Sequence, residues 1–343
     1  MTSLASRPRP SRGVSHAVAL LALIGLAGTS GCRTENASSD STKPAGAASG
    51  SASPAARDSN VASSGAKRVG VTQGFKTPES VHYDPDLDAY FVSNIDGNPS
   101  AHDGKGSIMR IPADTTDSVR VFAESGKNGV QLDAPKGIAT AADMVYVADI
   151  DVVRVLDRRT GKLAKTIDLK PFKATFLNDI AVGPDGAIYV TDTGIAFDEK
   201  GGMSHPGVNR IFRIAIGAPN KVTEVAKGDS LANPNGIAWD AANKRFLIAT
   251  FGGKDVLTWT SDAKAPSHLA AGPGQYDGIE MLSDGRVLVS SWADSSVQVI
   301  QNGTMSKLVG NVSAPADIGV DTKRNVLAIP RFETNQVEFW KLP

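Results

Sequence analysis

The chain has 343 residues, with 36 basic and 36 acidic side chains and therefore no net charge at pH 7. This balance, without any basic block, argues against a nucleic-acid-binding protein. Thirty-four glycines and 19 prolines, together with the lack of a long helical periodicity, indicate short strands joined by many turns.

The first 32 residues have the features of an export signal and not of a folded domain. Three arginines precede an apolar run over residues 17–27, which is too short to form a stable transmembrane helix. Small residues then lead to Cys32 in the segment GTSGC, which resembles the lipobox of bacterial lipoprotein precursors, with Thr29 where that motif usually has leucine. The resemblance implies that Cys32 carries a lipid. The alternative is an ordinary cleaved signal followed by an incidental cysteine.

Residues 33–67 are rich in serine, alanine and glycine. Such a segment buries too little apolar surface to offset its ordering entropy, so we predict a flexible linker. Cys32 is the only cysteine, which excludes an intramolecular disulfide, and a thioether would remove a reactive thiol in an oxidising compartment. We therefore expect residues 68–343 to form a domain outside the cytoplasm, held at a membrane through the lipid on Cys32.

Six similar stretches begin at intervals of 39 to 57 residues along this predicted domain. In each, a short polar turn leads into an apolar run, and a second, a third and usually a fourth strand-like run follow. Four strands in a unit of about 46 residues are typical of a β-propeller, so we predict an all-β, six-bladed propeller with four-stranded blades. The six stretches are TPESVHYD, APKGIATA, FLNDIAVG, NPNGIAWD, QYDGIEML and APADIGVD.

The sixth unit reaches the end of the chain after its third strand, whereas the strand-like segment KRVGVTQG precedes the first unit. We expect this N-terminal segment to supply the outer strand of the last blade, because that closure removes two exposed sheet edges. In a propeller the first strand of each blade lines the central channel. The starts of the six first strands should therefore meet at one end of the channel.

One position in these starts varies from unit to unit, and we call it the slot. Carboxylate and amide oxygens in several slots suit a hard cation, and calcium more than magnesium because several protein ligands converge; another divalent cation is an alternative. No slot holds histidine or cysteine, which argues against zinc. The other interpretation is that these side chains cap strand ends by hydrogen bonds to the backbone. The slots hold Glu79, Lys136, Asn178, Asn235, Asp277 and Ala316.

The segments PESV, LNDIAVGPDG, PNGIAWD and YDGIEMLSDG resemble the regucalcin/gluconolactonase family, and NDIAVGP also resembles the paraoxonases. The resemblance covers residues 68–343. It implies a six-bladed propeller with a catalytic calcium at the channel mouth, and metal-dependent hydrolysis of lactones or other esters. It also implies that Glu79, Asn235 and Asp277 are metal ligands, and that Asn178 is a ligand or holds the substrate and its water.

Two slots differ from the pattern of the family. Paraoxonase-like sequences have PHGI, with a histidine assigned to proton transfer, where this chain has PKGI. A lysine of ordinary pKa is a poor general base near pH 7, so we expect Lys136 either to hold an anionic substrate group or to be a solvated lysine at the rim. In the last unit Ala316 offers no ligand. Asp317 beside it is expected to form a turn or to support the ligands, and the alternative is an added acid or base.

Two units are longer than the others, because residues 95–106 and 194–209 are inserted between their second and third strands. Loops at that place return to the channel mouth, and long glycine-rich loops there often act as lids. Each insertion carries one histidine, His102 or His205, and these are the alternative groups for proton transfer. Two further histidines, His82 and His268, are expected to be structural or exposed.

The sequence thus predicts a calcium-dependent lactonase or esterase that is tethered outside the cytoplasm. The metal would polarise the carbonyl oxygen and bind the attacking water, and Asp277 or a lid histidine would take the proton. The expected partners are a small lactone or ester and, through the lipid, a membrane. The alternative is a non-enzymatic propeller that binds a small ligand or a protein on the same face and uses calcium as a structural clip.

Overall fold

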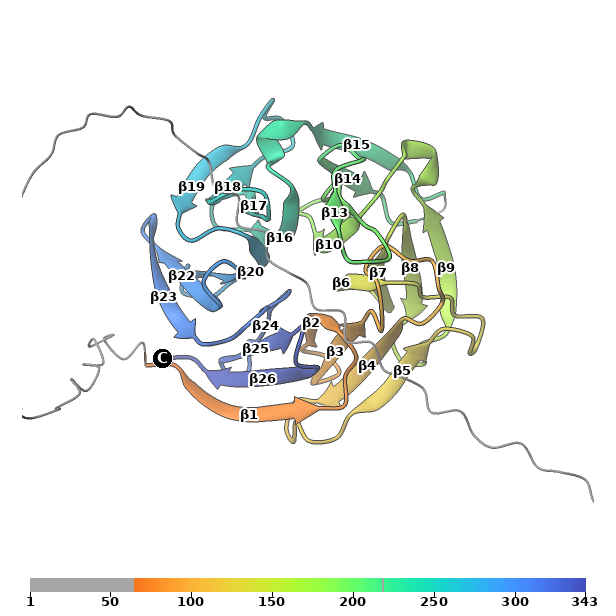
Figure 1. Ribbon diagram of the computed structural model, residues 1–343, viewed down its shortest axis with the longest axis horizontal. Helices are drawn as coiled ribbons and strands as arrows, with labels where there is room; N and C mark the ends of the chain where they lie inside the picture. Colours follow the sequence, from red (N-terminus) through yellow and green to blue (C-terminus); the bar gives the residue numbers. More distant parts are fainter. Residues whose placement is uncertain (1–64, 218) are drawn as a thin grey trace, which may run out of the picture. The chain divides into compact units, whose positions relative to one another are not determined.

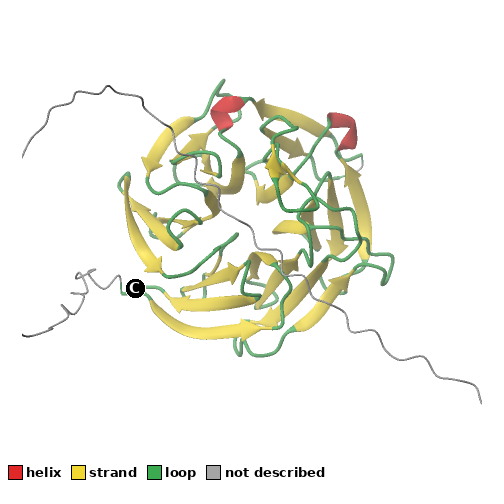
Figure 2. Ribbon diagram, in the orientation of Figure 1, coloured by secondary structure: helices red, strands yellow, loops and turns green. Residues whose placement is uncertain are grey.

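The computed structural model describes residues 65–217 and 219–343, and Cys32, the predicted signal and most of the predicted linker lie outside the described residues. The described chain forms six four-stranded antiparallel sheets around a central axis (Figure 1). Two short 3-10 segments, Lys170–Phe172 and Asp229–Leu231, are its helical parts (Figure 2). The prediction of an all-β, six-bladed propeller is confirmed. Within the described residues, no helix is long and apolar enough to cross a membrane.

In the first three blades the strands follow the order of the sequence from the axis outward. The third blade carries an additional hairpin of β12 (Ala196–Phe197) and β13 (Met203–Ser204) within the second insertion. The blade strands are β2 (Pro78–Asp84), β3 (Ala89–Asn94), β4 (Ser107–Pro112), β5 (Arg120–Glu124); β6 (Pro135–Ala141), β7 (Met144–Asp149), β8 (Val152–Asp157), β9 (Leu163–Asp168); β10 (Leu177–Val182), β11 (Ile188–Asp192), β14 (Arg210–Ile214), β15 (Val222–Lys227).

The fourth and fifth blades repeat this order, and the sixth combines strands from both ends of the described chain. The inner strand of the sixth blade is only three residues long. The strands are β16 (Pro234–Asp240), β17 (Arg245–Thr250), β18 (Asp255–Trp259), β19 (Ser267–Ala271); β20 (Tyr276–Met281), β21 (Val287–Ser291), β22 (Ser296–Gln301), β23 (Thr304–Gly310); β24 (Gly319–Asp321), β25 (Val326–Arg331), β26 (Gln336–Lys341), with β1 (Lys67–Gln73) outermost.

The ring is closed by β1, which pairs antiparallel with β26 from Lys67↔Lys341 to Gln73↔Gln336. Figure 1 shows β1, in orange, along the outer side of β26, in blue. The predicted closure by an N-terminal strand is therefore confirmed. It covers the edge of β26 that would otherwise offer unpaired backbone groups to another chain.

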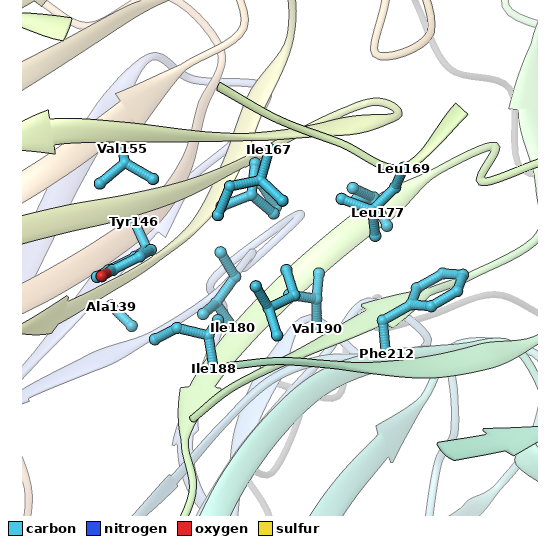
Figure 3. Packing of buried hydrophobic residues seen from close by; sticks show 13 residues of the cluster. Ala139, Tyr146, Val155, Ile167, Leu169, Leu177, Ile180, Ile188, Val190 and Phe212 are labelled. Atoms are coloured by element: carbon cyan, nitrogen blue, oxygen red, sulfur yellow. The ribbon is translucent and has the colours of Figure 1, made fainter. Parts of the chain in front are cut away.

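The hydrophobic core lies between neighbouring blades. Figure 3 shows one such layer, in which Tyr146 and Val155 of the second blade pack against Ile188, Val190 and Phe212 of the third. Every residue of β7 except the first is buried, because a blade in the ring is covered on both faces. This explains why the inner strands read as continuous apolar runs and not as an alternation.

A β-bulge interrupts the first strand of five blades at the slot. Between β2 and β3, for example, Pro78 pairs with Asn94 and Val81 with Val92, so that Glu79 and Ser80 together oppose Ser93. The same irregularity follows Pro135, Leu177, Pro234 and Tyr276. A bulge bends its strand and changes the direction of the side chain at that position, which in these five blades is the slot residue.

Close approach of neighbouring blades explains the glycine that follows several slots. A Cβ on Gly236 would lie 2.4 Å from the carbonyl oxygen of Asp277, and one on Gly278 would lie 2.5 Å from the Cα of Asp317. Both contacts are with backbone atoms, so the neighbouring blade would have to shift to accept a side chain here. In these two blades, packing therefore restricts the residue that follows the slot, whereas the slot residue itself is free to vary.

Candidate metal centre at the channel mouth

The first strands line the central channel as predicted. Its cavity of about 220 Å³ is bordered by residues of β2, β6, β10, β16 and β20, and by Asp317 and Ile318 before β24. The slot residues lie where these strands begin, at one end of the channel. All six are buried: Glu79, Lys136, Asn178, Asn235, Asp277 and Ala316.

Three of the predicted metal ligands each bury one oxygen that has no hydrogen-bond partner. These atoms are Glu79 Oε2, Asn235 Oδ1 and Asp277 Oδ1, and they come from three different blades. A buried oxygen without a partner is costly, because it has lost its hydration without replacement. Oxygen atoms left open in this way fit the first coordination sphere of a hard cation.

Two polar atoms of the ligand set form hydrogen bonds with side chains outside it. Trp292 Nε1 donates a hydrogen bond to Asp277 Oδ2 over 2.9 Å. Asn178 Nδ2 donates to Thr193 Oγ1 over 3.0 Å, which leaves its amide oxygen for a cation or substrate. Such contacts from outside the ligand set fix ligand orientation.

The composition of the set agrees with calcium more than with a transition metal. Among residues 65–217 and 219–343, no group of three or more His, Cys, Asp or Glu side chains could hold a metal ion by itself. The candidate set instead combines two carboxylates, Glu79 and Asp277, with two amides, Asn178 and Asn235. Carboxylate and amide oxygens together are a common calcium set.

Burial makes the carboxylates of the site difficult to ionise without a cation. It raises the pKa of Asp277 to about 8, although the hydrogen bond from Trp292 acts in the opposite direction. Burial and the nearby Asp277 raise the pKa of Glu79 well above its usual value, against the attraction of Lys136. A divalent cation would favour the ionised forms, so its binding would release protons.

Two further buried carboxylates line the channel next to the slots. Asp179 accepts backbone hydrogen bonds from Ile180 (2.6 Å) and from Ile237 of the next blade (2.7 Å), and burial raises its pKa to about 7. Asp317 accepts a hydrogen bond from Ser80 Oγ over 2.5 Å. Asp317 thus joins the last blade to the first.

Asp179 was not identified from the sequence. It occupies the place after the slot where three other blades have glycine, at Gly137, Gly236 and Gly278. That departure from the repeat was the available signal. The role of Asp179 as a carboxylate that bridges two blades could not be read from the sequence, because it depends on the distance between those blades.

Lys136 is buried in the site, with only 1% of its surface exposed, so the alternative of a solvated rim lysine is wrong. Its ammonium group donates to the carbonyl oxygens of Pro99 (3.1 Å) and Ala134 (2.9 Å), and lies 4.2 Å from the ring centre of Phe176. Burial lowers the pKa of Lys136 to about 8, although Glu79 opposes this shift.

The two insertions contact each other beside Lys136. Asn98 Nδ2 donates to the carbonyl of Asp198 over 2.6 Å, and the backbone N–H of Phe197 donates to Ser100 Oγ over 3.0 Å. Since Lys136 binds the carbonyl of Pro99, the first insertion reaches the slot residues directly. The expectation that both insertions return to the channel mouth is confirmed.

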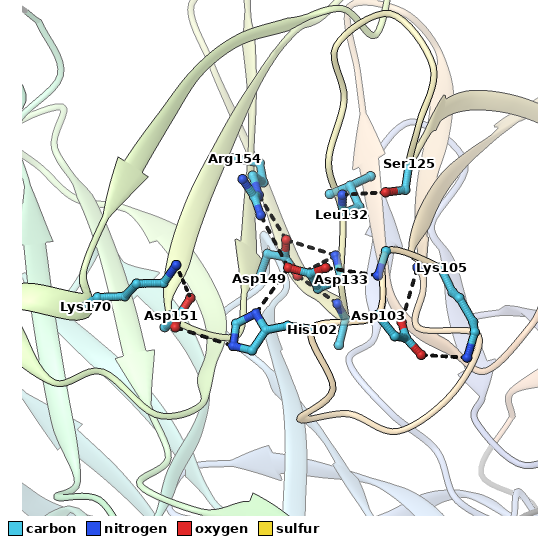
Figure 4. Close-up of polar contacts among 12 residues, drawn as sticks. His102, Asp103, Lys105, Ser125, Leu132, Asp133, Asp149, Asp151, Arg154 and Lys170 are labelled. Atoms are coloured by element: carbon cyan, nitrogen blue, oxygen red, sulfur yellow. Dashed lines mark hydrogen bonds and ion pairs between the residues drawn. The ribbon is translucent and has the colours of Figure 1, made fainter.

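The histidines of the insertions are engaged elsewhere. His102 Nδ1 lies 3.2 Å from Asp133 Oδ2, and its Nε2 lies 3.5 Å from Asp151 Oδ2 (Figure 4). His205 is exposed, and its polar contact is Asn233 Nδ2 at 3.4 Å. In the described part of the chain, neither histidine hydrogen-bonds to a slot residue. His82 is half-buried in the channel, 3.1 Å from Thr140, and His268 is exposed.

The comparison with solved structures agrees with this architecture. A putative gluconolactonase aligns with a TM-score of 0.58 and 15% identity, over 80% of this chain and 91% of that chain. A luciferin-regenerating enzyme gives 0.57 and 13%, over 78% and 91%. Virginiamycin B lyase from Staphylococcus aureus gives 0.53 and 13%, over 80% and 99%. At these identities the similarity concerns the fold.

The sequence comparisons give a family. A search of curated proteins finds no match. The family described as "SMP-30/Gluconolactonase/LRE-like region" matches residues 103–320, which include the slots from Lys136 to Ala316. This agrees with the resemblance of the slot segments, and the chain belongs to the SMP-30/gluconolactonase/LRE-like family.

Proposed function

We propose that this protein is a calcium-dependent hydrolase of lactones or related esters, with Glu79, Asn178, Asn235 and Asp277 as its metal ligands. The observation that carries the proposal is the set of three buried, unpartnered oxygens from three blades at one end of the channel. Membership of the SMP-30/gluconolactonase family supports the reaction class. Another divalent cation in place of calcium is compatible with the same ligands.

The residues of the site have separate tasks in this proposal. Bound by the four ligands, the cation would supply a Lewis acid for the substrate carbonyl. Asn178, held by Thr193, orients the substrate and the attacking water. The Asp277 carboxylate, held through one oxygen by Trp292, accepts a proton from that water.

Bond changes in the reaction balance without any further reagent. The water oxygen forms a bond with the carbonyl carbon, and the bond from this carbon to the ring or ester oxygen breaks. The proton held by Asp277 passes to the leaving oxygen. A lactone thus gives a hydroxy acid, and an ester gives an acid and an alcohol.

Lys136 is suited to hold negative charge in this site. Two of its three N–H groups donate to the carbonyls of Pro99 and Ala134, so one is free for a substrate carboxylate or the product acid. His102 and His205 were candidates for proton transfer, but their contacts are with Asp133, Asp151 and Asn233. We therefore assign proton transfer to Asp277.

A hydrolysis assay tests the proposal. Purified protein is offered lactones and aryl esters, with calcium and with a chelator, and Glu79→Gln is the matched variant because it removes one ligand charge at nearly constant size. We expect calcium-dependent turnover that Glu79→Gln abolishes or reduces at least a hundredfold. Calcium binding without turnover on any substrate would favour the second candidate, a non-enzymatic ligand-binding propeller. The position of Lys136 in place of a family histidine is the observation that favours that candidate.

We further propose that the enzyme acts outside the cytoplasm, tethered to a membrane through Cys32. The support is the segment GTSGC after an apolar run, together with the absence of any other cysteine in the sequence. A substrate would then reach the channel mouth from the extracytoplasmic side.

A further inference from the structure

The residue that follows the second strand of a blade lies at the channel mouth in a repeated position. In five blades its backbone N–H donates to the carbonyl of the residue two places before the slot, over 2.9 to 3.1 Å. The second strand runs antiparallel to the first, so its end lies beside the slot. The donor and acceptor pairs are Ile95–Thr77, Thr193–Phe176, Phe251–Asn233, Trp292–Gln275 and Phe332–Ala314.

In the last three blades this position holds an aromatic residue. The rings of Phe251 and Trp292 lie 6.1 Å apart at 79°, and those of Trp292 and Phe332 lie 5.4 Å apart at 60°. These edge-to-face contacts are favourable for aromatic pairs. Phe332 also packs against Ile95 and Ile150, so the apolar surface continues toward the first two blades. We call Phe251, Trp292 and Phe332 the aromatic wall.

The aromatic wall reaches the candidate metal centre. Trp292 belongs to the wall and donates its indole N–H to Asp277 Oδ2. A substrate carbonyl bound to a cation held by Glu79 and Asp277 would therefore have the indole ring nearby. The wall thus places apolar surface next to a candidate ligand of the cation.

The three wall residues lie in short loops of their own blades. Only four residues separate β17 from β18, β21 from β22, and β25 from β26, whereas the two insertions belong to blades one and three. All three wall residues are partly exposed. Contiguous apolar groups left exposed around a polar centre are typical of ligand sites.

We propose that the aromatic wall binds the apolar part of the substrate, so that this enzyme prefers lactones or esters with an alkyl or aryl substituent over polyhydroxylated sugar lactones. The inference rests on the proposed hydrolase function of the same site. Sugar hydroxyls need hydrogen-bond partners, and the one polar group of the wall, Trp292 Nε1, already binds Asp277. An alkyl chain or aryl ring instead removes apolar surface from water.

A chain-length series tests this preference. The value of kcat/KM is measured for γ-lactones from butyrolactone to decalactone and for glucono-δ-lactone. We expect decalactone to exceed butyrolactone by at least tenfold, and Phe332→Ala or Phe251→Ala to reduce that ratio at least fivefold. Phe172→Ala is the control, because Phe172 is an exposed phenylalanine that packs on Phe212 of blade three, away from the wall. It should leave the ratio unchanged.

Binding measurements separate the wall from the chemistry. Decanoate and gluconate are titrated against the calcium-loaded protein, and binding is followed by calorimetry and by tryptophan fluorescence. Decanoate should bind at least tenfold more tightly than gluconate. Phe332→Leu should weaken decanoate binding less than Phe332→Ala does. The comparison of these two variants also identifies an alanine variant that fails to fold. Tight decanoate binding without hydrolysis of any lactone or ester would refute the hydrolase function but support the wall. Hydrolysis with a preference for glucono-δ-lactone, unchanged in Phe332→Ala, would refute the wall alone.

Discussion

Ser80 and Asp317 join the first blade to the last through their side chains: the Ser80 hydroxyl donates to the Asp317 carboxylate over 2.5 Å. Backbone hydrogen bonds accompany this contact, from Asp317 N to the Glu79 carbonyl (2.8 Å) and from Val81 N to the Asp317 carbonyl (3.1 Å). The inner end of the ring is therefore closed at the slot itself, and β1 closes it at the outer edge. Closure of the ring and geometry of the candidate site are physically linked.

Truncation tests the outer closure. A chain that begins at residue 66 retains β1, whereas one that begins at residue 75 lacks it and exposes the edge of β26. We expect the shorter chain to melt at least 5 °C lower, which corresponds to roughly 2 kcal/mol for a domain of this size. Thermal unfolding followed by circular dichroism gives the comparison. Equal melting temperatures would show that β1 contributes little to the closed ring.

Replacement of the lone cysteine tests the tether. Cys32→Ser removes the only thiol to which a lipid could be attached, so the protein should move from the membrane fraction to the soluble fraction. Ser30→Ala, two residues earlier, is the control and should leave the distribution unchanged. Fractionation of cells that produce each variant provides the measurement. Membrane retention of Cys32→Ser would contradict the lipid anchor.

His102 should position the first insertion and not transfer protons. It lies between Asp133 and Asp151 (Figure 4). The insertion that contains it also supplies the Pro99 carbonyl to Lys136. We expect His102→Ala to accelerate proteolytic cleavage within residues 95–106 severalfold while turnover falls less than tenfold. His268→Ala is the control, because His268 forms a similar exposed pair with Asp255 on blade four. A loss of turnover above a hundredfold, without faster cleavage, would instead favour a catalytic His102.

The sequence was sufficient for the architecture because the repeat is local. Each unit carries its own turn, apolar runs and slot, and the missing strand of the sixth unit indicated β1. The burial of Lys136 was not predictable, since it depends on Pro99 in an insertion 37 positions away. The aromatic wall was missed for a similar reason. Phe251, Trp292 and Phe332 become neighbours only when three blades are placed around the axis.

Charge changes within the ligand set test the metal site. Asp277→Asn keeps the size of the side chain but removes a negative charge that faces the cation, so calcium affinity should fall at least tenfold. Asn235→Asp adds a charge and should preserve or increase the affinity, unless the crowded carboxylates repel each other. Calorimetric titration of calcium measures both. Glu280→Gln, a carboxylate of the channel wall outside the slots, is the control and should change affinity less than threefold.

The same variant tests the role of Asp277 in proton transfer. An amide cannot accept the proton, so Asp277→Asn should show no turnover even when calcium saturates it. Turnover that recovers at high calcium would show that Asp277 only binds the metal. Wild-type protein that takes up no calcium would exclude the metal site altogether.

The stability of the calcium-free protein should depend on pH in a defined direction. Burial raises the pKa of Asp277 to about 8 and that of Asp179 to about 7, whereas unfolded aspartates titrate near ~3.9. Because the folded values are the higher ones, the stabilising contribution is complete below about pH 4 and is lost as the pH rises through 7 to 8. We therefore expect the free energy of unfolding in chelator to fall between pH 5 and pH 8.5.

Asp277→Asn should reduce this loss, since an amide does not ionise. In chelator at pH 8.5 we expect the variant to be more stable than the wild type, and the difference should shrink steadily as the pH falls toward 4. Urea unfolding at several pH values measures the difference, with Asp262→Asn as the control because Asp262 is exposed. Calcium should reverse the order at pH 8.5, because it binds the folded wild type through the ionised carboxylate and adds stability that the variant lacks. Parallel unfolding profiles for wild type and Asp277→Asn, with and without calcium, would mean that Asp277 neither ionises in this range nor binds the cation.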